Sequence, residues 1–385
     1  MKRKDYLPFG KPNFSDAEIS AVTEVLRSGW VGMGPQTMAF EEELAAFLNV
    51  SHVITVSSCT AALFLSLLVE GIQPDDEVIC PSLTWCSTAD VILHLGAKVV
   101  FCDVDPNTLC VTPDLIKEKL TSKTKAVIIV HYGGLAVNVD EIRAILPAHI
   151  SIIEDAAHAI GAKYTNQKNV GSSKNLTCFS FYANKNLSTA EGGAITLVDN
   201  EKAERLKALR LHGIYHDAWK RFKESKSLII SEFLELGYKM NYTDLQACIG
   251  RIQLKRQSEF NKTRLQIAET YYQVLSTSFP LLNFQFNILD VNHARHLFVI
   301  QLPIERMCYG RDKFIQKLRD VNIGASIHYR PLHTIAHYKG NCHLLNTEYL
   351  YERIVTLPIS SSMDLNDTEY VLEKVINLLS AAISD

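Results

Sequence analysis

No pair of cysteines in this sequence has the C-x-x-C spacing of a zinc site or a redox motif, although the chain contains nine cysteines. Their odd number and wide scatter also argue against a disulfide framework, and free thiols fit a reducing compartment. The basic N-terminal run MKRKDYLPF is not followed by the apolar segment that a signal peptide needs. The apolar run 61–69 is too short to span a bilayer. We therefore expect a cytoplasmic protein without a metal site and without contact with a membrane.

The sequence also lacks an excess of charge of one sign, because 42 acidic and 39 basic residues leave a net charge of −3. A basic excess is what drives binding to nucleic acids and anionic membranes, so neither is expected as a partner. We expect small-molecule partners instead. Hydrophobic residues make up 47% of the chain and charged residues 21%, which is typical of a packed globular protein. At 385 residues the chain exceeds the size of one hydrophobic core, which predicts two domains.

Over the first two-thirds of the chain, short β-branched apolar runs alternate with helical patterns, which is typical of an α/β fold built around a mostly parallel sheet. Their near-continuous hydrophobicity predicts burial on both faces of the sheet. The predicted strands are His52–Val56, Glu77–Cys80, Lys98–Cys102, Ala126–His131, Ser151–Glu154, Thr177–Phe181 and Gly193–Val198.

Helical patterns lie between these strands, for example at Thr60–Leu68 and Pro113–Leu120, and Ser15 with Glu18 forms a capping box. After about residue 250 the pattern changes, because a long polar helical stretch, Leu245–Val274, leads into a segment with fewer strands. We therefore expect a large domain over residues 1–250 and a smaller C-terminal domain over residues 251–385.

Candidate catalytic side chains lie between residues 151 and 193. The segment SIIEDAAHAIGA places Asp155 and His158 after an apolar strand, where α/β folds present catalytic groups. The segment CFSFYANKNLSTAEGGAI places Lys185 in a loop after another strand. A lone loop lysine is usually solvated, but a lysine that forms an imine needs an electron-sink cofactor. Pyridoxal 5′-phosphate (PLP) becomes such a sink when a carboxylate keeps its pyridine nitrogen protonated. We therefore expect Lys185 to bind PLP as a Schiff base, with Asp155 as that carboxylate.

Two further segments fit the other parts of PLP. PSLTWCSTAD offers Trp85 to stack on the ring, although a buried structural role is equally compatible with a tryptophan. TVSSCTAAL passes from a strand into a helix that begins near Thr60, and the N–H groups and dipole of a helix N-terminus bind phosphate. This turn is weak support alone, because Ser and Thr cap many helices that bind no ligand.

The sequence resembles the DegT/DnrJ/StrS family of PLP-dependent nucleotide-sugar aminotransferases in eight runs whose order and spacing extend through nearly the whole chain: SGWVGMGP, PSLTWCSTAD, VTPDLI, VHYGG, IIEDAAHAIGA, FSFYANKNLSTAEGG, LGYKMNYTDLQA and IGASIHYR. The resemblance implies PLP-dependent transferase fold type I, that of the aspartate aminotransferase superfamily, with a large, mostly parallel seven-stranded domain and a smaller α+β C-terminal domain. It also implies that glutamate donates an amino group to a keto-sugar nucleotide. PSLTW, VHYGG and EDAAHA are most similar to the aminoarabinose branch, which favours a UDP-linked 4-keto sugar and an amino sugar destined for surface polysaccharide or lipid.

Position by position, the resemblance assigns cofactor-binding roles to Cys59, Thr60, Trp85, Asp155, Ala157, His158, Ser180, Lys185 and Asn241. In this assignment Lys185, Asp155 and His158 are the catalytic group, and His158 lies near the phenolic oxygen of the ring. Ala157 and Trp85 pack on opposite ring faces, while the backbone at 59–60 and the Ser180 hydroxyl hold the phosphate. Asn241 would reach the phosphate from the second subunit of a homodimer.

Three positions depart from the family pattern. Cys59 stands where many relatives have Gly or Ala, and Tyr182 stands where His is common. GYKMNYTD differs from the commoner G-Y-N-Y-R form, which leaves open whether Lys239 or Asn241 contacts the phosphate. None of these changes removes a group that the chemistry needs.

For the substrate, Trp30, His328 and Arg330 are the candidate contacts, since the planar guanidinium of arginine suits phosphate oxygens. A packing or surface role is an equal alternative for each. Two other functions stay open at this point. Some relatives carry out dehydration, but they typically have histidine at the lysine position, and others are regulators, but no DNA-binding module is appended here.

Overall fold

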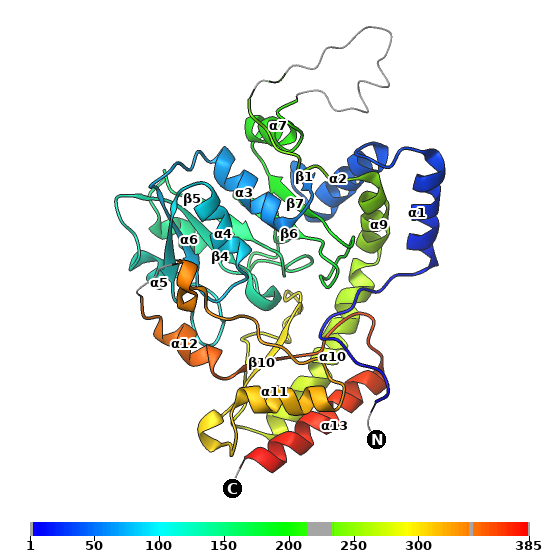
Figure 1. The fold of residues 1–385 in the computed structure, drawn as a ribbon, viewed down its shortest axis with the longest axis vertical. Coiled ribbons are helices and arrows are strands. Elements are labelled where there is room, and N and C mark those ends of the chain that lie inside the picture. Colours follow the sequence, from blue (N-terminus) through cyan, green and yellow to red (C-terminus); the bar gives the residue numbers. More distant parts are fainter. Residues whose placement is uncertain (1–2, 215–232, 234, 339–341, 384–385) are drawn as a thin grey trace.

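The computed structural model describes residues 3–214, 233, 235–338 and 342–383. Seven strands form one sheet in the order β1-β7-β6-β5-β4-β2-β3 (Figure 1). Their bounds are β1 His52–Val56, β2 Glu77–Pro81, β3 Lys98–Cys102, β4 Thr124–Val130, β5 Ser151–Asp155, β6 Leu176–Ser180 and β7 Gly193–Leu197. Strand β7 is antiparallel to β1 and β6, and the other strands run parallel to one another. The predicted mostly parallel seven-stranded sheet is therefore confirmed, as are all seven predicted strands.

Helices cover both faces of this sheet. One face carries α3 (Cys59–Val69), α4 (Ser87–His94) and α7 (Asn200–Leu209), and the other carries α2 (Pro35–Leu48), α5 (Pro113–Lys117), α6 (Val139–Ile145) and α9 (Asp244–Lys255). Neighbouring strand residues such as Ile152 and Ile153 are buried in different hydrophobic clusters, one on each face. Burial on both faces explains why the strands read as continuous apolar runs.

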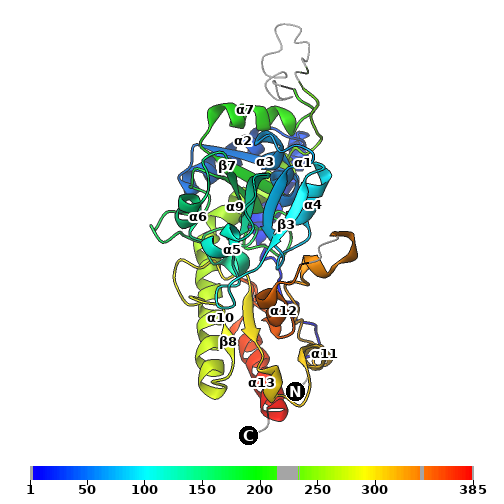
Figure 2. The same cartoon turned by 90° about the vertical axis from the view of Figure 1, so that its left-hand side faces the viewer.

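A second, smaller layer of elements lies below the large sheet (Figures 1 and 2). It contains α10 (Gln257–Ser278), α11 (Arg311–Asp320), α12 (Leu345–Tyr351) and α13 (Leu365–Ala382) beside a three-stranded antiparallel sheet of β8 (Asn283–Phe284), β9 (Phe298–Gln301) and β10 (Ile354–Leu357). Its own core is built from residues 267 onward together with Leu7. Residue 250 lies within α9, and we keep the division there into two domains as a proposal.

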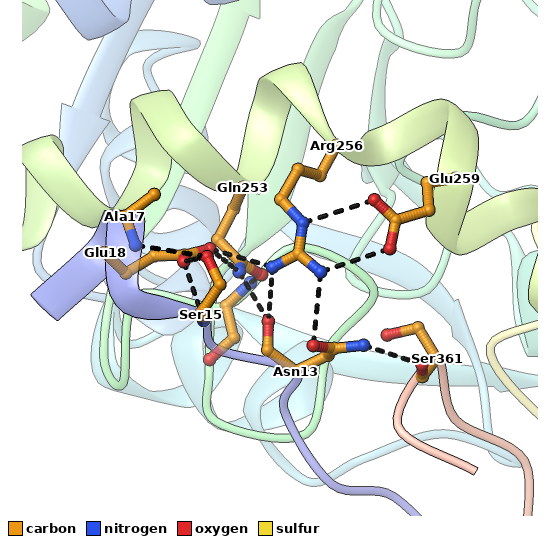
Figure 3. Close-up of polar contacts among 9 residues, drawn as sticks. Asn13, Ser15, Ala17, Glu18, Gln253, Arg256, Glu259 and Ser361 are labelled. Carbon is orange, nitrogen blue, oxygen red and sulfur yellow. Dashed lines mark hydrogen bonds and ion pairs between the residues drawn. The ribbon is translucent and has the colours of Figure 1, made fainter. Parts of the chain in front are cut away.

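The predicted helical stretch Leu245–Val274 is formed by two helices, α9 and α10, which meet at Arg256. The guanidinium of Arg256 donates to the backbone oxygen of Asn13 at 3.2 Å and pairs with Glu18 and Glu259 (Figure 3). Glu18 also closes the capping box with Ser15 at the start of α1 (Asp16–Ser28), as predicted. Arg256 therefore connects the N-terminal segment to the junction of α9 and α10.

The helix predicted over Pro113–Leu120 is α5, which ends at Lys117.

None of the helices in the described part of the chain combines the length and apolarity needed to cross a bilayer. The described residues also contain no group of three or more His, Cys, Asp or Glu side chains placed to hold a metal ion.

Candidate active site

A cavity of about 560 Å³ lies at the carboxyl ends of the parallel strands, between the large sheet and the segment 326–329. Loops that leave neighbouring parallel strands meet at this edge, so residues distant in sequence come together here. The cavity is lined by nine of the predicted site residues: Cys59, Thr60, Trp85, Asp155, Ala157, His158, Ser180, Lys185 and His328.

Lys185 lies in the loop after β6, where its backbone N–H donates to the oxygen of Tyr182 at 2.9 Å. Burial lowers the pKa of Lys185 to about 8, although the carboxylate of Asp155 opposes this shift. Its Nζ lies 3.5 Å from Nε2 of His296. With that pKa, the Lys185 amine is uncharged in roughly a tenth of the molecules near pH 7, whereas an ordinary lysine is uncharged in a negligible fraction. The amine is therefore suited to act as a nucleophile and as a base.

Asp155 ends β5 with a buried carboxylate. Burial raises the pKa of Asp155, while the backbone N–H of Ala157 donates to Oδ1 at 3.1 Å and the hydroxyl of Thr88 donates to Oδ2 at 2.9 Å. An ionised carboxylate can accept further hydrogen bonds beyond these two. A cationic N–H placed against Asp155 would form a charge-assisted bond and offset the cost of burial. These features fit the protonated pyridine nitrogen of PLP.

His158 directly follows Ala157, the backbone donor to Asp155, and its imidazole is neutral. Burial holds the pKa of His158 well below its usual value, and the charge of Lys185 lowers it further. Nδ1 accepts the backbone N–H of Gly133 at 3.3 Å, so the ring proton is on Nε2, which lies 3.0 Å from the hydroxyl of Tyr329. The rings of His158 and Tyr329 stack with centroids 6.1 Å apart. The pair provides hydrogen-bond donors inside the cavity without adding charge.

Trp85 is 60% exposed at the edge of the cavity. Its ring centroid lies 5.8 Å from that of Tyr329, at an interplanar angle of 57°. A structural tryptophan would be expected to bury most of its surface in the core. The exposed indole beside the cavity therefore favours the ligand-stacking interpretation of Trp85 over the packing one.

The start of α3 also lines the cavity. Ser58 caps this helix by accepting the backbone N–H of Ala61 on its hydroxyl, and the first intrahelical bond runs from the N–H of Ala62 to the oxygen of Ser58. The N–H groups of Cys59 and Thr60 precede that bond and lie at the positive end of the helix dipole. The arrangement suits a phosphate dianion.

Hydroxyl groups lie beside this helix start. Thr60 Oγ1 donates to Ser87 Oγ at 2.8 Å, and Ser180 is buried at the end of β6. The thiol of Cys59 donates to the backbone oxygen of Cys178 at 3.6 Å. The unusual cysteine is therefore hydrogen-bonded to a neighbouring strand.

Gly193, the second residue of the Gly192–Gly193 pair, lets β7 approach the same helix start. A Cβ on Gly193 would lie 2.7 Å from the backbone nitrogen of Cys59 and 2.6 Å from the carbonyl carbon of Ser58. Both contacts are with backbone atoms, which cannot move aside as a flexible side chain can. Glycine is therefore required here for the helix to keep its position at the cavity.

Asn241 and Lys239 lie close to the strand end but are not among the residues that line the cavity. The backbone oxygen of Met240 accepts the N–H of Ser57 at 2.8 Å, which holds this segment beside β1. Lys239 Nζ donates to Asn241 Oδ1 at 2.5 Å. A contact of either residue with phosphate in a second subunit stays a prediction.

The structure separates the three predicted substrate contacts. His328 is buried in the cavity wall, with Nδ1 2.8 Å from the hydroxyl of Thr356. Arg330 is exposed two residues further along. Trp30 lies in another hollow between α1, α2 and α9, where its Nε1 donates to the oxygen of Met33 at 3.2 Å. Only His328 is therefore placed inside the cavity of this chain.

The sequence did not predict three residues that contact the predicted ones: Thr88 beside Asp155, His296 beside Lys185 and Tyr329 beside His158. Tyr329 lies inside the run IGASIHYR, and its position between His328 and Arg330 was a usable signal. Thr88 follows Trp85 by three residues, at the start of α4. His296 gave no local signal, because it is 111 residues from its partner Lys185.

Comparison with known proteins gives a consistent result. A model of the DegT/DnrJ/EryC1/StrS aminotransferase family matches residues 12–376. The chain is 41% identical to the spore coat polysaccharide biosynthesis protein SpsC of Bacillus subtilis, with 99% of each chain covered. Among solved structures, the aminotransferase TlmJ of Streptoalloteichus hindustanus has a TM-score of 0.89 at 33% identity, covering 98% of this chain and 99% of TlmJ. The PLP form of Spr1654 of Streptococcus pneumoniae has a TM-score of 0.86 at 28% identity, covering 97% and 99%.

Proposed function

Because this chain belongs to the DegT/DnrJ/EryC1/StrS family of PLP-dependent sugar aminotransferases, we propose that it transfers the amino group of glutamate to a keto-sugar nucleotide. The proposed acceptor is a UDP-linked 4-keto sugar, and the products are an amino sugar nucleotide and 2-oxoglutarate. The observation that carries the proposal is the cavity that places Lys185 and Asp155 together beside a helix N-terminus. A cavity of about 560 Å³ is within the usual range for a small-molecule or cofactor site. The similarity to SpsC supports a product used in polysaccharide synthesis.

Each of four cavity residues has a separate role in the proposed reaction. Lys185 would hold the cofactor covalently, and once free its Nζ would take the α-proton of the amino donor. Bound PLP supplies the electron sink that stabilises the negative charge on the α-carbon after the proton is removed. Asp155 would keep the ring nitrogen protonated, while His158 would donate a hydrogen bond from Nε2 to the ring oxygen. Trp85, from the cavity edge, would stack on the ring and exclude water from one of its faces.

We further propose that the active unit is a homodimer with shared sites. Lys185 is the only lysine or arginine among the described residues that line the cavity. A cofactor phosphate and a nucleotide diphosphate would together bring several negative charges, which calls for further cations. Asn241 and Lys239 lie at the surface beside β1, where a second copy could receive them. All nine cysteines are free, which supports a cytoplasmic location.

The first test of this proposal is chemical trapping. Borohydride treatment of the purified holoenzyme should bleach its visible absorbance and leave the cofactor attached to the peptide that contains Lys185. Glutamate should then change the spectrum of untreated enzyme, and a panel of UDP-, GDP- and dTDP-linked 3-keto and 4-keto sugars should identify the acceptor. A spectrum that responds to glutamate, together with turnover of only dTDP-linked or 3-keto sugars, would reject the proposed acceptor and leave the family assignment intact. A spectrum that no amino acid changes would favour dehydration instead.

A further inference from the structure

His296 is a buried side chain beside Lys185 that the mechanism above does not use. It is buried two residues before β9, in the smaller domain, and its Nε2 lies 3.5 Å from Lys185 Nζ. Its ring centroid lies 4.4 Å from that of His158, which lines the cavity. The segment just before β9 therefore contributes a polar group beside the lysine amine.

The hydrogen bonds of Asn186 fix which nitrogen of His296 carries the proton. The side-chain amide of Asn186 donates through Nδ2 to the backbone oxygen of Ala294 at 2.7 Å. Its Oδ1 therefore faces Nδ1 of His296, at 3.1 Å. An amide oxygen can only accept, so Nδ1 of the imidazole must be the protonated nitrogen. Nε2 is then left with a lone pair directed at Lys185 Nζ.

The surrounding charges keep this imidazole neutral. Burial holds the pKa of His296 well below its usual value, and the charge of Lys185 lowers it further, followed by smaller effects from His158, Arg264 and His328. Arg264 is buried, and its guanidinium donates to the backbone oxygens of Arg295 and Ile359. Its positive charge is therefore not cancelled at short range by the groups it contacts. Protonation of His296 near neutral pH would place a third buried cation here.

We propose that His296 is the positioning residue for Lys185. Its Nε2 accepts a hydrogen bond from Nζ, and its tautomer is set by Asn186, so the free amine is held at the cavity wall whenever it is not bonded to the cofactor. A neutral acceptor stabilises the ammonium more than the amine, since the ammonium is the stronger donor. Burial therefore lowers the pKa of Lys185, while His296 limits how far it falls. This role does not depend on which sugar is the substrate.

Competitive acetylation of the full-length, cofactor-free protein tests this role without using activity. Trace labelling with acetic anhydride across a range of pH, followed by mass spectrometry of the peptide that contains Lys185, gives the pKa of that amine. His296→Phe removes the acceptor and should lower this pKa by about one unit, a tenfold shift of the protonation equilibrium. His296→Gln can offer an amide oxygen near the position of Nε2 and should return the pKa most of the way.

A matched control is His328→Phe, which removes another buried histidine of the cavity, one that is hydrogen-bonded to Thr356. It should leave the pKa of Lys185 at its wild-type value. The proposal is overturned if His296→Phe causes no shift, if His296→Gln shifts the pKa as far as His296→Phe, or if His328→Phe produces the same fall.

A second measurement decides the matter even if His296→Phe does not fold. Nitrogen NMR of the wild-type protein labelled at its thirteen histidines, with the His296 signals assigned by their loss in His296→Gln, reports the tautomer. A protonated Nδ1 with a bare Nε2 supports the proposal. A proton on Nε2 overturns it, because that nitrogen could then not accept a bond from Lys185.

Discussion

Thr88→Val is the most informative single change for the role of Asp155. Thr88 is fully buried, and its hydroxyl donates to Asp155 Oδ2 at 2.9 Å while lying 2.9 Å from the hydroxyl of Thr84. Valine keeps the branched shape but replaces the hydroxyl with a methyl group. The carboxylate would keep only the bond from the backbone N–H of Ala157 among those described. The substitution therefore removes one donor from a buried charge with little change in volume.

The expected magnitude follows from the loss of one hydrogen bond to a charged group. Such bonds contribute about 1.5–3 kcal/mol, which corresponds to roughly 10- to 100-fold in an equilibrium or a rate. The pKa of Asp155, which burial already raises, should rise further in the variant. Fewer molecules then carry the carboxylate at a given pH. We expect kcat to fall at least about tenfold at neutral pH, and the acid limb of the kcat profile to move to higher pH.

Steady-state kinetics against pH with saturating PLP would measure both effects, and circular dichroism would check the fold. Thr88→Ser is the matched control, because it keeps the hydroxyl and should retain most of the wild-type rate. A correctly folded Thr88→Val variant with an unchanged kcat and an unmoved acid limb would refute the assignment of Asp155 as a carboxylate held ionised by its neighbours. Equal losses in the serine and valine variants would instead point to a packing effect.

Three further changes test other parts of the site. Because the folded-state pKa of Lys185, about 8, is below its ordinary value of 10.5, the charged form costs stability at neutral pH, and this cost disappears as pH rises from about 8 to 10.5. Lys185→Met should therefore stabilise the cofactor-free protein by up to about 3 kcal/mol in urea unfolding at pH 7, and by less at pH 10. Gly193→Ala should weaken PLP binding at least about tenfold in a fluorescence titration, because its Cβ would displace the backbone at Cys59. Trp85→Ala should leave the melting temperature nearly unchanged, since the side chain is 60% exposed, yet weaken PLP binding about two- to tenfold.

The fold could be predicted well where local patterns decide the structure. Each strand of the large sheet is buried on both faces, so its apolar run is visible without knowledge of its neighbours. The junction at Arg256 could not be predicted, because the break between α9 and α10 coincides with contacts to Asn13 and Glu18, more than 200 residues away. A periodic polar stretch contains no sign of such a distant contact.

Prediction of the site residues is limited in the same way, because contacts between distant segments leave no local sequence pattern. Lys185, Asp155 and Trp85 were identifiable because each follows a predicted strand within a recognisable run. His296 and the hydroxyl of Thr88 act through contacts with those residues, and neither has a local pattern of its own. Trp30 was expected at the substrate, and in this chain it lies in a separate hollow. Sequence patterns therefore find the groups that would touch the cofactor more readily than the groups that hold them in place.

The adjacent carboxylates Glu154 and Asp155 lie in different surroundings at the end of β5. Successive side chains of a strand point to opposite faces, so only one of the two can face the cavity. The carboxylate of Glu154 is buried and accepts bonds from His131, Tyr164 and Asn175 at 2.8, 2.6 and 2.8 Å. Burial raises the pKa of Glu154, but the bonds from His131, Ser173 and Tyr164 hold it below its usual value, so its negative charge is stabilised within the protein. Asp155, with fewer donors and a raised pKa, is the carboxylate that still gains from a cation, which supports our proposal that it holds the cofactor nitrogen.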